Sequence, residues 1–440
     1  NTVEITYYES GDSAALIETV TCGNRTYYYT YTNRILDEAY IVFESAHHGE
    51  QYAYTDDVLT TVTNPGGHDY VLSYDQNNRV TDVLNPLEQN EDISYGTEAG
   101  DNVVTTLLNH VTQKYYYDQT NNTLHKQQFM SEPATVYTCD ADFNVTGVTN
   151  PDNTTASSTY DSSGNVLTWT NEAGKITEYT YGDTNNPDLP TQVSEPFNGA
   201  NKKVTVNAYD AYGNLTATSV TGIPQATTFT YDSLGNVLTQ TVTITGAGGS
   251  SVSTTEYEYD AKGRLVETTN PDDSTTGQTY DSYGNTDTMT DANGVVTKYE
   301  YDLLGRCTST TTAYGTDDEA TTSSTYDAMG NVLTSTDAEG NDTATVYDVL
   351  GRQTHVTNAD ETEETTTYTV QSDGTQVELN TDAEGNRRGS IYDPKGQVVC
   401  SGVFGTLENN DSNYDAPLPL GCVLPANVTY DTENKCYRYD

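Results

Sequence analysis

The chain has 440 residues and a formal net charge of -47, from 18 Lys and Arg against 65 Asp and Glu. So acidic a surface excludes nucleic acid as a partner, because duplex binding depends on Lys and Arg that neutralise phosphates, and it disfavours anionic membranes for the same reason. Only 34% of the residues are hydrophobic, which excludes a thick globular core. The 37 Tyr, with abundant Thr and Val, nevertheless favour β-strands over disorder.

The chain begins Asn1-Thr2-Val3-Glu4-Ile5, without an initiator Met and without the charged and apolar segments of a signal peptide. No apolar run approaches the roughly 18 residues that a membrane-spanning helix needs. We therefore expect a secreted product that has been processed or excised, located outside the cell or at its surface, and with no segment inserted in a membrane.

Residues 1–158 are predicted to hold divergent copies of a β-hairpin unit that begins with Tyr-Asp. The copies at Tyr74 and Tyr117 carry Asn where later copies carry Gly, and Asn tolerates left-handed backbone better than other non-Gly residues. A third copy begins at Cys139, which replaces the tyrosine, and residues 29–35 form a shortened member.

Residues 159–402 form a regular array of the pattern Tyr-Asp-x-x-Gly-Asn/Arg. The spacings from Tyr259 to Tyr280, from Tyr280 to Tyr301 and from Tyr326 to Tyr347 are all 21 residues, as is the next one to a degenerate copy at Tyr368. Other spacings are longer, as insertions into turns would make them. The residues that define the eight close copies are Tyr160, Asp161, Gly164; Tyr209, Asp210, Gly213; Tyr231, Asp232, Gly235; Tyr259, Asp260, Gly263; Tyr280, Asp281, Gly284; Tyr301, Asp302, Gly305; Tyr326, Asp327, Gly330; and Tyr347, Asp348, Gly351.

Each unit contains two turn signals. The first is the motif itself, in which Asp can bond the backbone that follows it and Gly supplies a positive φ. The second lies half a repeat later, as in Asp337-Ala338-Glu339-Gly340-Asn341. Two turns per 21 residues predict two strands of about seven residues each.

The predicted strands alternate in character. In residues 297–301, Tyr299 and Tyr301 share one face and the charged residues share the other. We expect the Tyr face to be the better buried one. Its hydroxyls then need partners, which the neighbouring Thr and Asn residues, or water, can supply.

Residues 403–440 are predicted to be an irregular tail containing Pro and Cys, with a final partial repeat that opens at Tyr430-Asp431. The six cysteines include no Cys-x-x-Cys pair, which argues against zinc and thioredoxin-like sites. A disulfide between Cys422 and Cys436 would tie down the tail. Cys139 and Cys307 occupy strand positions, where buried free thiols are the simplest interpretation.

The repeated Tyr-Asp-x-x-Gly-Asn/Arg unit resembles the YD or RHS repeats of bacterial rearrangement-hotspot proteins, wall-associated proteins, the C components of insecticidal toxin complexes and animal teneurins. The clear copies cover roughly residues 160–400. The resemblance implies a spiral sheet whose turns build a hollow shell, and the longer members of the family wrap a toxic or signalling cargo. Many of them end in a domain with an aspartyl self-cleavage site, and nothing after residues 392–396 resembles that domain.

The number of repeats itself predicts a coil. On the order of 40 antiparallel strands at about 4.8 Å each would make a flat ribbon more than about 150 Å wide. Sheets beyond roughly 10 strands twist and curl. We therefore predict an all-β fold in which one continuous repeat domain forms a long antiparallel meander, with about two strands per 21 residues, coiled into a spiral or shell-like sheet.

No pattern of residues predicts a catalytic site or a cofactor. The carboxylate pairs at 56–57, 272–273 and 317–319 fall on expected turns, which lack the enclosure that acid–base catalysis requires. Calcium is the one metal that the acidic turns favour, at stacked Asp-x-x-Gly-Asn loops; diffuse counterion binding is the alternative. His47 and His48 are adjacent and would point to opposite faces of a strand, which argues against zinc.

Three functional hypotheses follow, none of them enzymatic. The first is a structural protein, a wall or filament subunit at a microbial cell surface that serves in attachment, protection or cell contact and continues by self-association or into further repeats. The second is a fragment of a shell that encapsulates a toxin. The third is an adhesion module that binds a glycan or a protein, with Trp169 as a residue on which a sugar could stack.

Overall fold

The structure, a computed structural model, describes residues 3–9, 11, 13–22, 25–43, 46–108, 111–198, 201–371, 374–406, 428–431 and 436–439. Thirty-six strands form one sheet. Every strand of this sheet pairs antiparallel with the strands before and after it in sequence, from the β1–β2 pair to the β35–β36 pair. The fold is therefore a simple meander, as the repeat predicted.

In the first third of the sheet the strands are β1 (Val3–Tyr7), β2 (Ile17–Cys22), β3 (Arg25–Thr32), β4 (Ile35–Phe43), β5 (Ala46–Thr55), β6 (Val58–Thr63), β7 (Asp69–Tyr74), β8 (Val80–Leu84), β9 (Asn90–Glu98), β10 (Asp101–Leu108), β11 (Val111–Asp118) and β12 (Leu124–Phe129). The middle third contains β13 (Thr135–Cys139), β14 (Val145–Thr149), β15 (Thr155–Tyr160), β16 (Val166–Thr170), β17 (Ile176–Thr180), β18 (Gln192–Pro196), β19 (Lys202–Tyr209), β20 (Leu215–Val220), β21 (Gln225–Tyr231), β22 (Val237–Gly246), β23 (Gly249–Tyr259) and β24 (Leu265–Thr269).

The last third contains β25 (Thr275–Tyr280), β26 (Thr286–Thr290), β27 (Val296–Tyr301), β28 (Cys307–Thr312), β29 (Ala320–Tyr326), β30 (Val332–Thr336), β31 (Asp342–Tyr347), β32 (Gln353–Thr357), β33 (Glu363–Val370), β34 (Gln376–Thr381), β35 (Asn386–Tyr392) and β36 (Val398–Thr406). A separate two-stranded hairpin is formed by β37 (Val428–Asp431) and β38 (Cys436–Tyr439).

The two kinds of turn lie on opposite edges of the ribbon. Each regular Tyr-Asp motif joins an odd-numbered strand to the next even-numbered one, and the second kind of turn joins even to odd. We call the first kind YD turns and the second kind interposed turns. Because successive strands run in opposite directions, all YD turns gather along one edge and all interposed turns along the other.

A β-bulge accompanies the YD turns. In the β15–β16 pair, Thr159 lies opposite Thr168 and Tyr160 lies opposite Val166, so that Leu167 is an extra residue. The same shift precedes the tyrosine at Tyr231, Tyr280 and six other regular or divergent copies between Tyr74 and Tyr347. Bulges increase the local right-handed twist, and their repetition along one edge bends the ribbon steadily in one direction.

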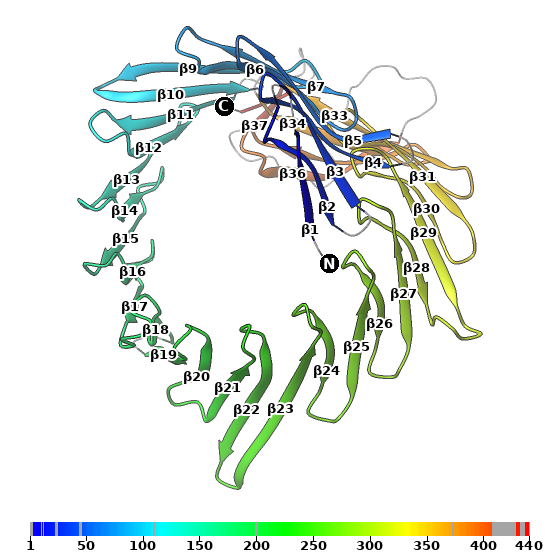
Figure 1. Ribbon diagram of the computed structural model, residues 1–440. Helices are drawn as coiled ribbons and strands as arrows, with labels where there is room; N and C mark the ends of the chain where they lie inside the picture. Colours follow the sequence, from blue (N-terminus) through cyan, green and yellow to red (C-terminus); the bar gives the residue numbers. More distant parts are fainter. Residues whose placement is uncertain are drawn as a thin grey trace.

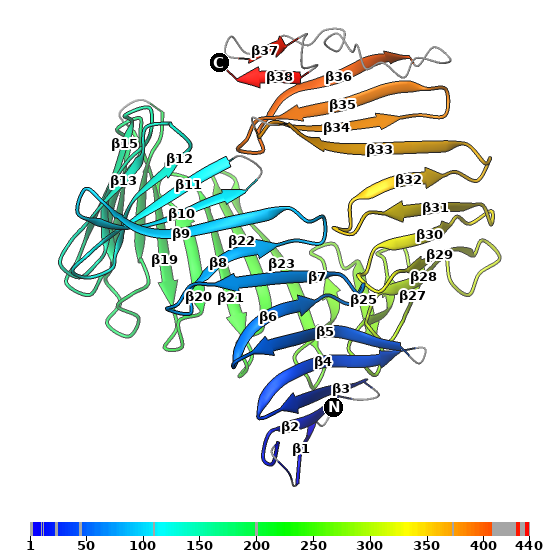
Figure 2. The same ribbon diagram turned by 90° about the horizontal axis from the view of Figure 1, so that it is seen from above.

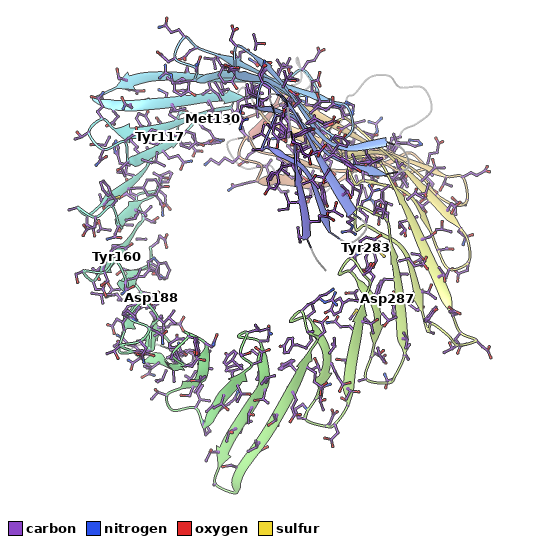
Figure 3. All side chains as sticks on the ribbon, viewed as in Figure 1. Tyr117, Met130, Tyr160, Asp188, Tyr283 and Asp287 are labelled. Atoms are coloured by element: carbon purple, nitrogen blue, oxygen red, sulfur yellow. The ribbon has the colours of Figure 1, made fainter. Side chains whose placement is uncertain are left out.

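The ribbon coils into a spiral around an open centre (Figure 1). Seen from above, β1 and β36 lie at opposite ends of the particle (Figure 2). The first and last strands do not pair, so the sheet is not closed. The described side chains cover the wall and leave the centre of the ring open (Figure 3). The coiled meander predicted from the sequence is thus confirmed.

Burial alternates along many strands, and its sense differs between odd-numbered and even-numbered strands. Along β15 and β31 the residues that alternate with the tyrosine are exposed, whereas those on its own side are half-buried. The face opposite the tyrosines carries threonine pairs across strands, such as Thr159 with Thr168 at 2.7 Å. In β16 and β30 the order of burial is reversed, because Trp169 and Ser335 lie on the tyrosine side, opposite Ser158 and Ser324, and are exposed. The expected burial of the Tyr face therefore holds in odd-numbered strands such as β15 and does not extend to these even-numbered ones. Buried apolar side chains in the described part of the chain are few and scattered: Ile41, Val103, Tyr116, Leu379 and Ile391.

The observed strands of the main sheet are 5 to 11 residues long, against about seven expected. Pairing runs without interruption from β14 through β15 to β16, across the predicted boundary at 158/159. Both that boundary and the one at 402/403 remain predictions. Most of the tail lies outside the described residues.

Candidate functional site

Each YD turn is held by its aspartate. In the third-to-last regular copy, the Asp302 Oδ1 accepts hydrogen bonds from the backbone N–H groups of Leu304 and Arg306, at 2.9 and 3.0 Å. The Gly305 N–H donates to the Asp302 carbonyl at 3.0 Å, and Gly305 has a φ of +83°. The carboxylate thus replaces the backbone acceptors that a tight reversal leaves missing.

All eight regular copies share this backbone. Their glycines lie at positive φ, between 77° and 100°: Gly164, Gly213, Gly235, Gly263, Gly284, Gly305, Gly330 and Gly351. In every copy the glycine N–H donates to the carbonyl of the motif aspartate: Asp161, Asp210, Asp232, Asp260, Asp281, Asp302, Asp327 and Asp348. The structure therefore places these predicted residues in one repeated turn along a single edge.

The tyrosine hydroxyl couples each repeat to the one before it. The Tyr347 hydroxyl donates to the Val332 carbonyl at 3.0 Å, and the Tyr231 hydroxyl donates to the Leu215 carbonyl at 2.7 Å. In both cases the acceptor lies six residues after the tyrosine of the preceding copy. The same spacing holds at Tyr181, Tyr259, Tyr280, Tyr326 and Tyr368, and at Tyr160, where the preceding copy begins with Cys139 in place of a tyrosine.

The acceptors belong to Val, Leu, Cys and Gln residues rather than to the neighbouring Thr and Asn residues that the sequence offered. The acceptor is a backbone carbonyl at the start of the strand that follows the preceding YD turn. On the side of the next strand this residue is unpaired, since β30 pairs with β31 only from Thr334 to Thr336, so the Tyr347 hydroxyl can reach the Val332 carbonyl. At Tyr209 the acceptor is the Pro190 carbonyl, at 3.0 Å, because an insertion lengthens the preceding turn. Tyr301 lies half-buried in the same row.

Ionisation of these side chains follows from the same contacts. Burial is the main cause that raises the pKa of Tyr231, Tyr259, Tyr301 and Tyr326. The Arg264 side chain bonds the carboxylate of Asp260 and lowers its pKa to about 2. The row is therefore built for neutral tyrosines and charged aspartates.

The residue after the turn glycine reaches forward to the next repeat. Where it is arginine, it bonds its own aspartate and its guanidinium lies over the next tyrosine ring, as Arg352 does over Tyr368 at 4.4 Å. Arg79, Arg264 and Arg306 do the same over Tyr95, Tyr280 and Tyr326. At these four YD turns an arginine therefore links one repeat to the tyrosine of the next.

Successive turns of the spiral touch at their edges, and we call this contact the seam. Lys395, in a YD turn, forms an ion pair with Glu132, in an interposed turn. The Lys395 ammonium group also lies over the ring of Phe129, at the end of β12. Met329, on another YD turn, packs against Gly66, where a Cβ atom would lie 2.9 Å from the Met329 Sδ.

The two seam contacts have the same offset. From Glu132 to Lys395 the separation is 263 residues, and from residue 66 to residue 329 it is also 263. The first contact joins the β12–β13 turn to the β35–β36 turn, and the second joins the β6–β7 turn to the β29–β30 turn. The two connected turns are 23 strands apart in each case. The 36 strands of the sheet therefore make about one and a half turns.

A third contact extends the seam toward the N-terminus. The Arg25 guanidinium lies 4.9 Å from the centre of the Tyr283 ring, and Figure 3 shows Tyr283 beside the N-terminal strands. A Cβ atom on Gly305 would lie 3.1 Å from Arg25. Interposed turns from the first winding of the spiral thus contact YD turns from the second winding.

Comparison with known families matches this architecture. Residues 201–313 match the Teneurin YD-shell model, and residues 160–200 and 326–363 match the RHS Repeat model. The chain belongs to the YD/RHS-repeat family. None of the curated proteins matches it at a significant level.

Solved structures similar to this YD/RHS-repeat chain include parts of Tc toxin complexes. The TcdB2-TccC3-TEV crystal structure is 12% identical with a TM-score of 0.42, covering 93% of this chain and 30% of the other. TcdB2-TccC3-Cdc42 is 11% identical with a TM-score of 0.43, covering 93% and 30%. The Tc holotoxin pore of Photorhabdus luminescens is 11% identical with a TM-score of 0.42, covering 94% and 29%. This chain spans about 30% of the length of these proteins.

The carboxylate pairs of this YD/RHS sheet lie on exposed turns. Asp56 and Asp57 form a tight turn at φ values of 50° and 64°, and Asp273 lies at a φ of 63°. Among the described residues there is no group of three or more His, Cys, Asp or Glu side chains that could hold a metal ion. The motif aspartates have both oxygens engaged by their own turns, as Asp161 has with Ser163 and Asn165.

The cysteine predictions are only partly within reach of the structure. Cys139 and Cys307 are free thiols on half-buried strand positions. Cys422 and the side chain of Cys436 lie outside the described residues, so the predicted disulfide stays a prediction. In the described part of the chain, no helix is long and apolar enough to cross a membrane.

One groove on the sheet was not predicted. It has a volume of about 400 Å³ and crosses β24–β27, where Thr268, Gln278, Met289 and Tyr299 are among the residues that line it. These residues lie on the Tyr face, since Gln278 alternates with Tyr280 and lies opposite Met289. The sequence could not reveal this groove, because its lining residues come from four different strands.

Proposed function

We propose that this chain is a structural, non-enzymatic protein whose coiled YD/RHS sheet forms a section of the wall of a hollow shell. The observation that carries the proposal is the seam. Two independent contacts share an offset of 263 residues, so the spiral has a regular pitch and its turns join edge to edge. A coil with that property makes a continuous wall rather than a loose ribbon.

The construction of the wall supports this role. YD/RHS repeat shells are generally structural, and this wall is one sheet thick around an open centre (Figures 1 and 2). With 23 strands per turn at about 4.8 Å per strand, its circumference is at least about 110 Å, which corresponds to roughly 35 Å across. The acidic surface keeps such a thin wall solvated.

Enclosure of a cargo such as a toxin accounts for this geometry better than a flat surface layer does, and we propose it ahead of the cell-surface wall or filament. We also propose that the protein acts outside the cell that makes it, as a secreted or surface-associated shell. Both proposals rest on the coil and on the family.

Small-angle scattering of the dilute chain tests the wall directly. We expect the scattering profile of a hollow, ring-like particle for the natural sequence. Lys395→Glu should open the seam, because it replaces the attraction to Glu132 with repulsion, and the radius of gyration should rise. Lys262→Glu is the matched control, since Lys262 holds the same position in its repeat and lies exposed, away from the seam. A solid globule, or equal expansion of both variants, would refute the proposal.

A second candidate function is glycan binding at the groove across β24–β27. Its lining of threonine hydroxyls, the Gln278 amide and the Tyr299 ring offers the hydrogen bonds and the aromatic surface that sugars use. A glycan array tests it, with Tyr299→Ala expected to abolish any signal. Trp169→Ala is the comparison, because Trp169 is 42% exposed on a different part of the sheet.

A further inference from the structure

The third residue after each YD tyrosine lies within the YD turn, directly before the turn glycine, and we call it the ridge position. At the regular copies and the looser copy at Tyr392 it is occupied by Ser163, Tyr212, Leu234, Lys262, Tyr283, Leu304, Met329, Leu350 and Lys395. The turn uses only the backbone N–H of this residue, as at Leu304, so the turn does not restrict which side chain stands there. The recurrence of large apolar or cationic residues here therefore requires a reason other than the turn itself.

In the second turn of the spiral, ridge residues make the seam. Tyr283 meets the Arg25 guanidinium at 4.9 Å. Met329 packs on Gly66, and Lys395 pairs with Glu132. The ridge position is thus the part of the repeat that touches an interposed-turn edge.

In the preceding stretch, the same position faces solvent. Tyr212 is 91% exposed and Leu234 is 74% exposed, and Lys262 is exposed as well. Their turns follow β19, β21 and β23, so neighbouring ridge residues are two strands, or about 10 Å, apart. This stretch therefore presents an aromatic, an aliphatic and a lysine side chain. The seam uses similar side chains at the same position, namely Tyr283, Met329 and Lys395.

We propose that Tyr212, Leu234 and Lys262 form a docking edge for a second copy of this chain, which presents its interposed-turn edge. The argument is continuity with the seam: the same repeat position, with the same chemistry, already binds that kind of edge within one chain. Large exposed apolar side chains in a row also mark interaction sites on otherwise acidic surfaces.

The second copy has an edge that fits. Interposed turns of the first half-turn are used in the seam, whereas those at 337–341, 358–362 and 382–386 lie further along the ribbon. They are acidic, with Glu339, Asp360 and Glu384 among them. A carboxylate from one of them would meet Lys262 as Glu132 meets Lys395.

Such a contact joins two different edges, so it is heterologous and does not close on itself as a two-fold dimer would. Copies would stack along the spiral axis in an open series. Each copy carries a charge of -47, and repulsion between copies opposes the stacking. Because the Debye length falls from about 10 Å at 0.1 M salt to about 3 Å at 1 M, salt should strengthen the association.

Sedimentation velocity of the full chain tests this inference across protein concentration and from low to high sodium chloride. We expect the weight-average mass to rise above 48.0 kDa with concentration, and to rise further with salt. The double variant Tyr212→Glu, Leu234→Glu should weaken association by more than about tenfold, because apolar anchors dominate such contacts.

Val346→Glu is the matched control, since Val346 is 54% exposed on the face of β31 rather than at its edge. It should associate as the natural chain does. Circular dichroism should show all three proteins folded, because the replaced side chains are exposed. A natural chain that stays at 48.0 kDa under every condition would overturn the inference, and so would equal association of the double variant or equal loss in the control.

Photo-crosslinking identifies the occupant of the edge. A benzophenone side chain at position 234 should join, between copies, to peptides that contain residues 337–386. Crosslinks to any other region would refute the proposed pairing of edges. Scattering at high dilution and low salt reports the ring of a single copy, so failure of the docking edge can be distinguished from failure of the wall.

Discussion

Removal of one tyrosine hydroxyl should loosen the sheet locally by a predictable amount. The Tyr347 hydroxyl donates to the Val332 carbonyl at 3.0 Å and joins one repeat to the previous one. Tyr347→Phe keeps the ring and deletes only this hydrogen bond, which is worth about 1 kcal/mol. The equilibrium for opening of the β30–β32 region should therefore rise about fivefold.

Native-state hydrogen exchange is the suitable assay, because repeat arrays are held by nearest-neighbour contacts and need not unfold in one step. The backbone amides of β30, β31 and β32 should lose about fivefold in protection, while those of β19–β22 should not change. Tyr212→Phe is the control, since the Tyr212 side chain is 91% exposed. Unchanged exchange in Tyr347→Phe, or equal loosening in both variants, would refute the idea that the tyrosine hydroxyls couple neighbouring repeats.

Three further outcomes are expected. Gly305→Ala should cost more stability than Gly340→Ala in thermal melts, because both glycines lie at φ near 83° but only Gly305 faces Arg25, at 3.1 Å from the added Cβ; equal losses would argue against the seam. Acid should unfold the chain as pH falls from near 4 toward 2, since Asp75 and Asp260 have pKa values lowered from 3.8 to about 2 and protonation of the folded state removes the stability that they supply above that range; circular dichroism that stays unchanged down to pH 2 would contradict this. Neither chelator nor millimolar calcium should shift the melting temperature, because the turn hydrogen bonds already engage the motif carboxylates, and a clear calcium-dependent rise would show specific sites.

Much of this fold could be predicted because its information is local. The Asp-x-x-Gly-Asn/Arg turn is fixed by side-chain chemistry within five residues, as Asp302 and Gly305 illustrate. The alternation of Tyr299 and Tyr301 on one side of a strand follows from the strand period. The need for the ribbon to coil follows from the number of strands alone.

The seam could not be predicted, because it depends on geometry that accumulates over many strands. The acceptors of the tyrosine hydroxyls could not be predicted either. One full turn in 23 strands corresponds to a bend of the sheet of about 16° per strand. A change of only about one degree per strand would move the seam by more than one strand. The carbonyl that receives each tyrosine hydroxyl depends likewise on where strand pairing stops, as it does at Thr334 in β30, and no residue type in the sequence marks the acceptor.

The insertion at the β17–β18 turn shows a further limit. Asn186 from this insertion is buried and its side chain donates to the Asp210 carbonyl of the next YD turn at 2.8 Å. The Asn165 side chain donates to the Pro187 carbonyl at 3.2 Å. The sequence indicated only a longer spacing between tyrosines, since the partners of an inserted loop are set by the neighbouring turns that it happens to cover.

Electron microscopy of the dilute chain is the most direct test of the coiled wall. The account predicts single particles with an open centre, in which the sheet overlaps itself for about half a turn, as 36 strands at 23 per turn require. A flat or rod-shaped ribbon without overlap, or a particle with a filled centre, would contradict it.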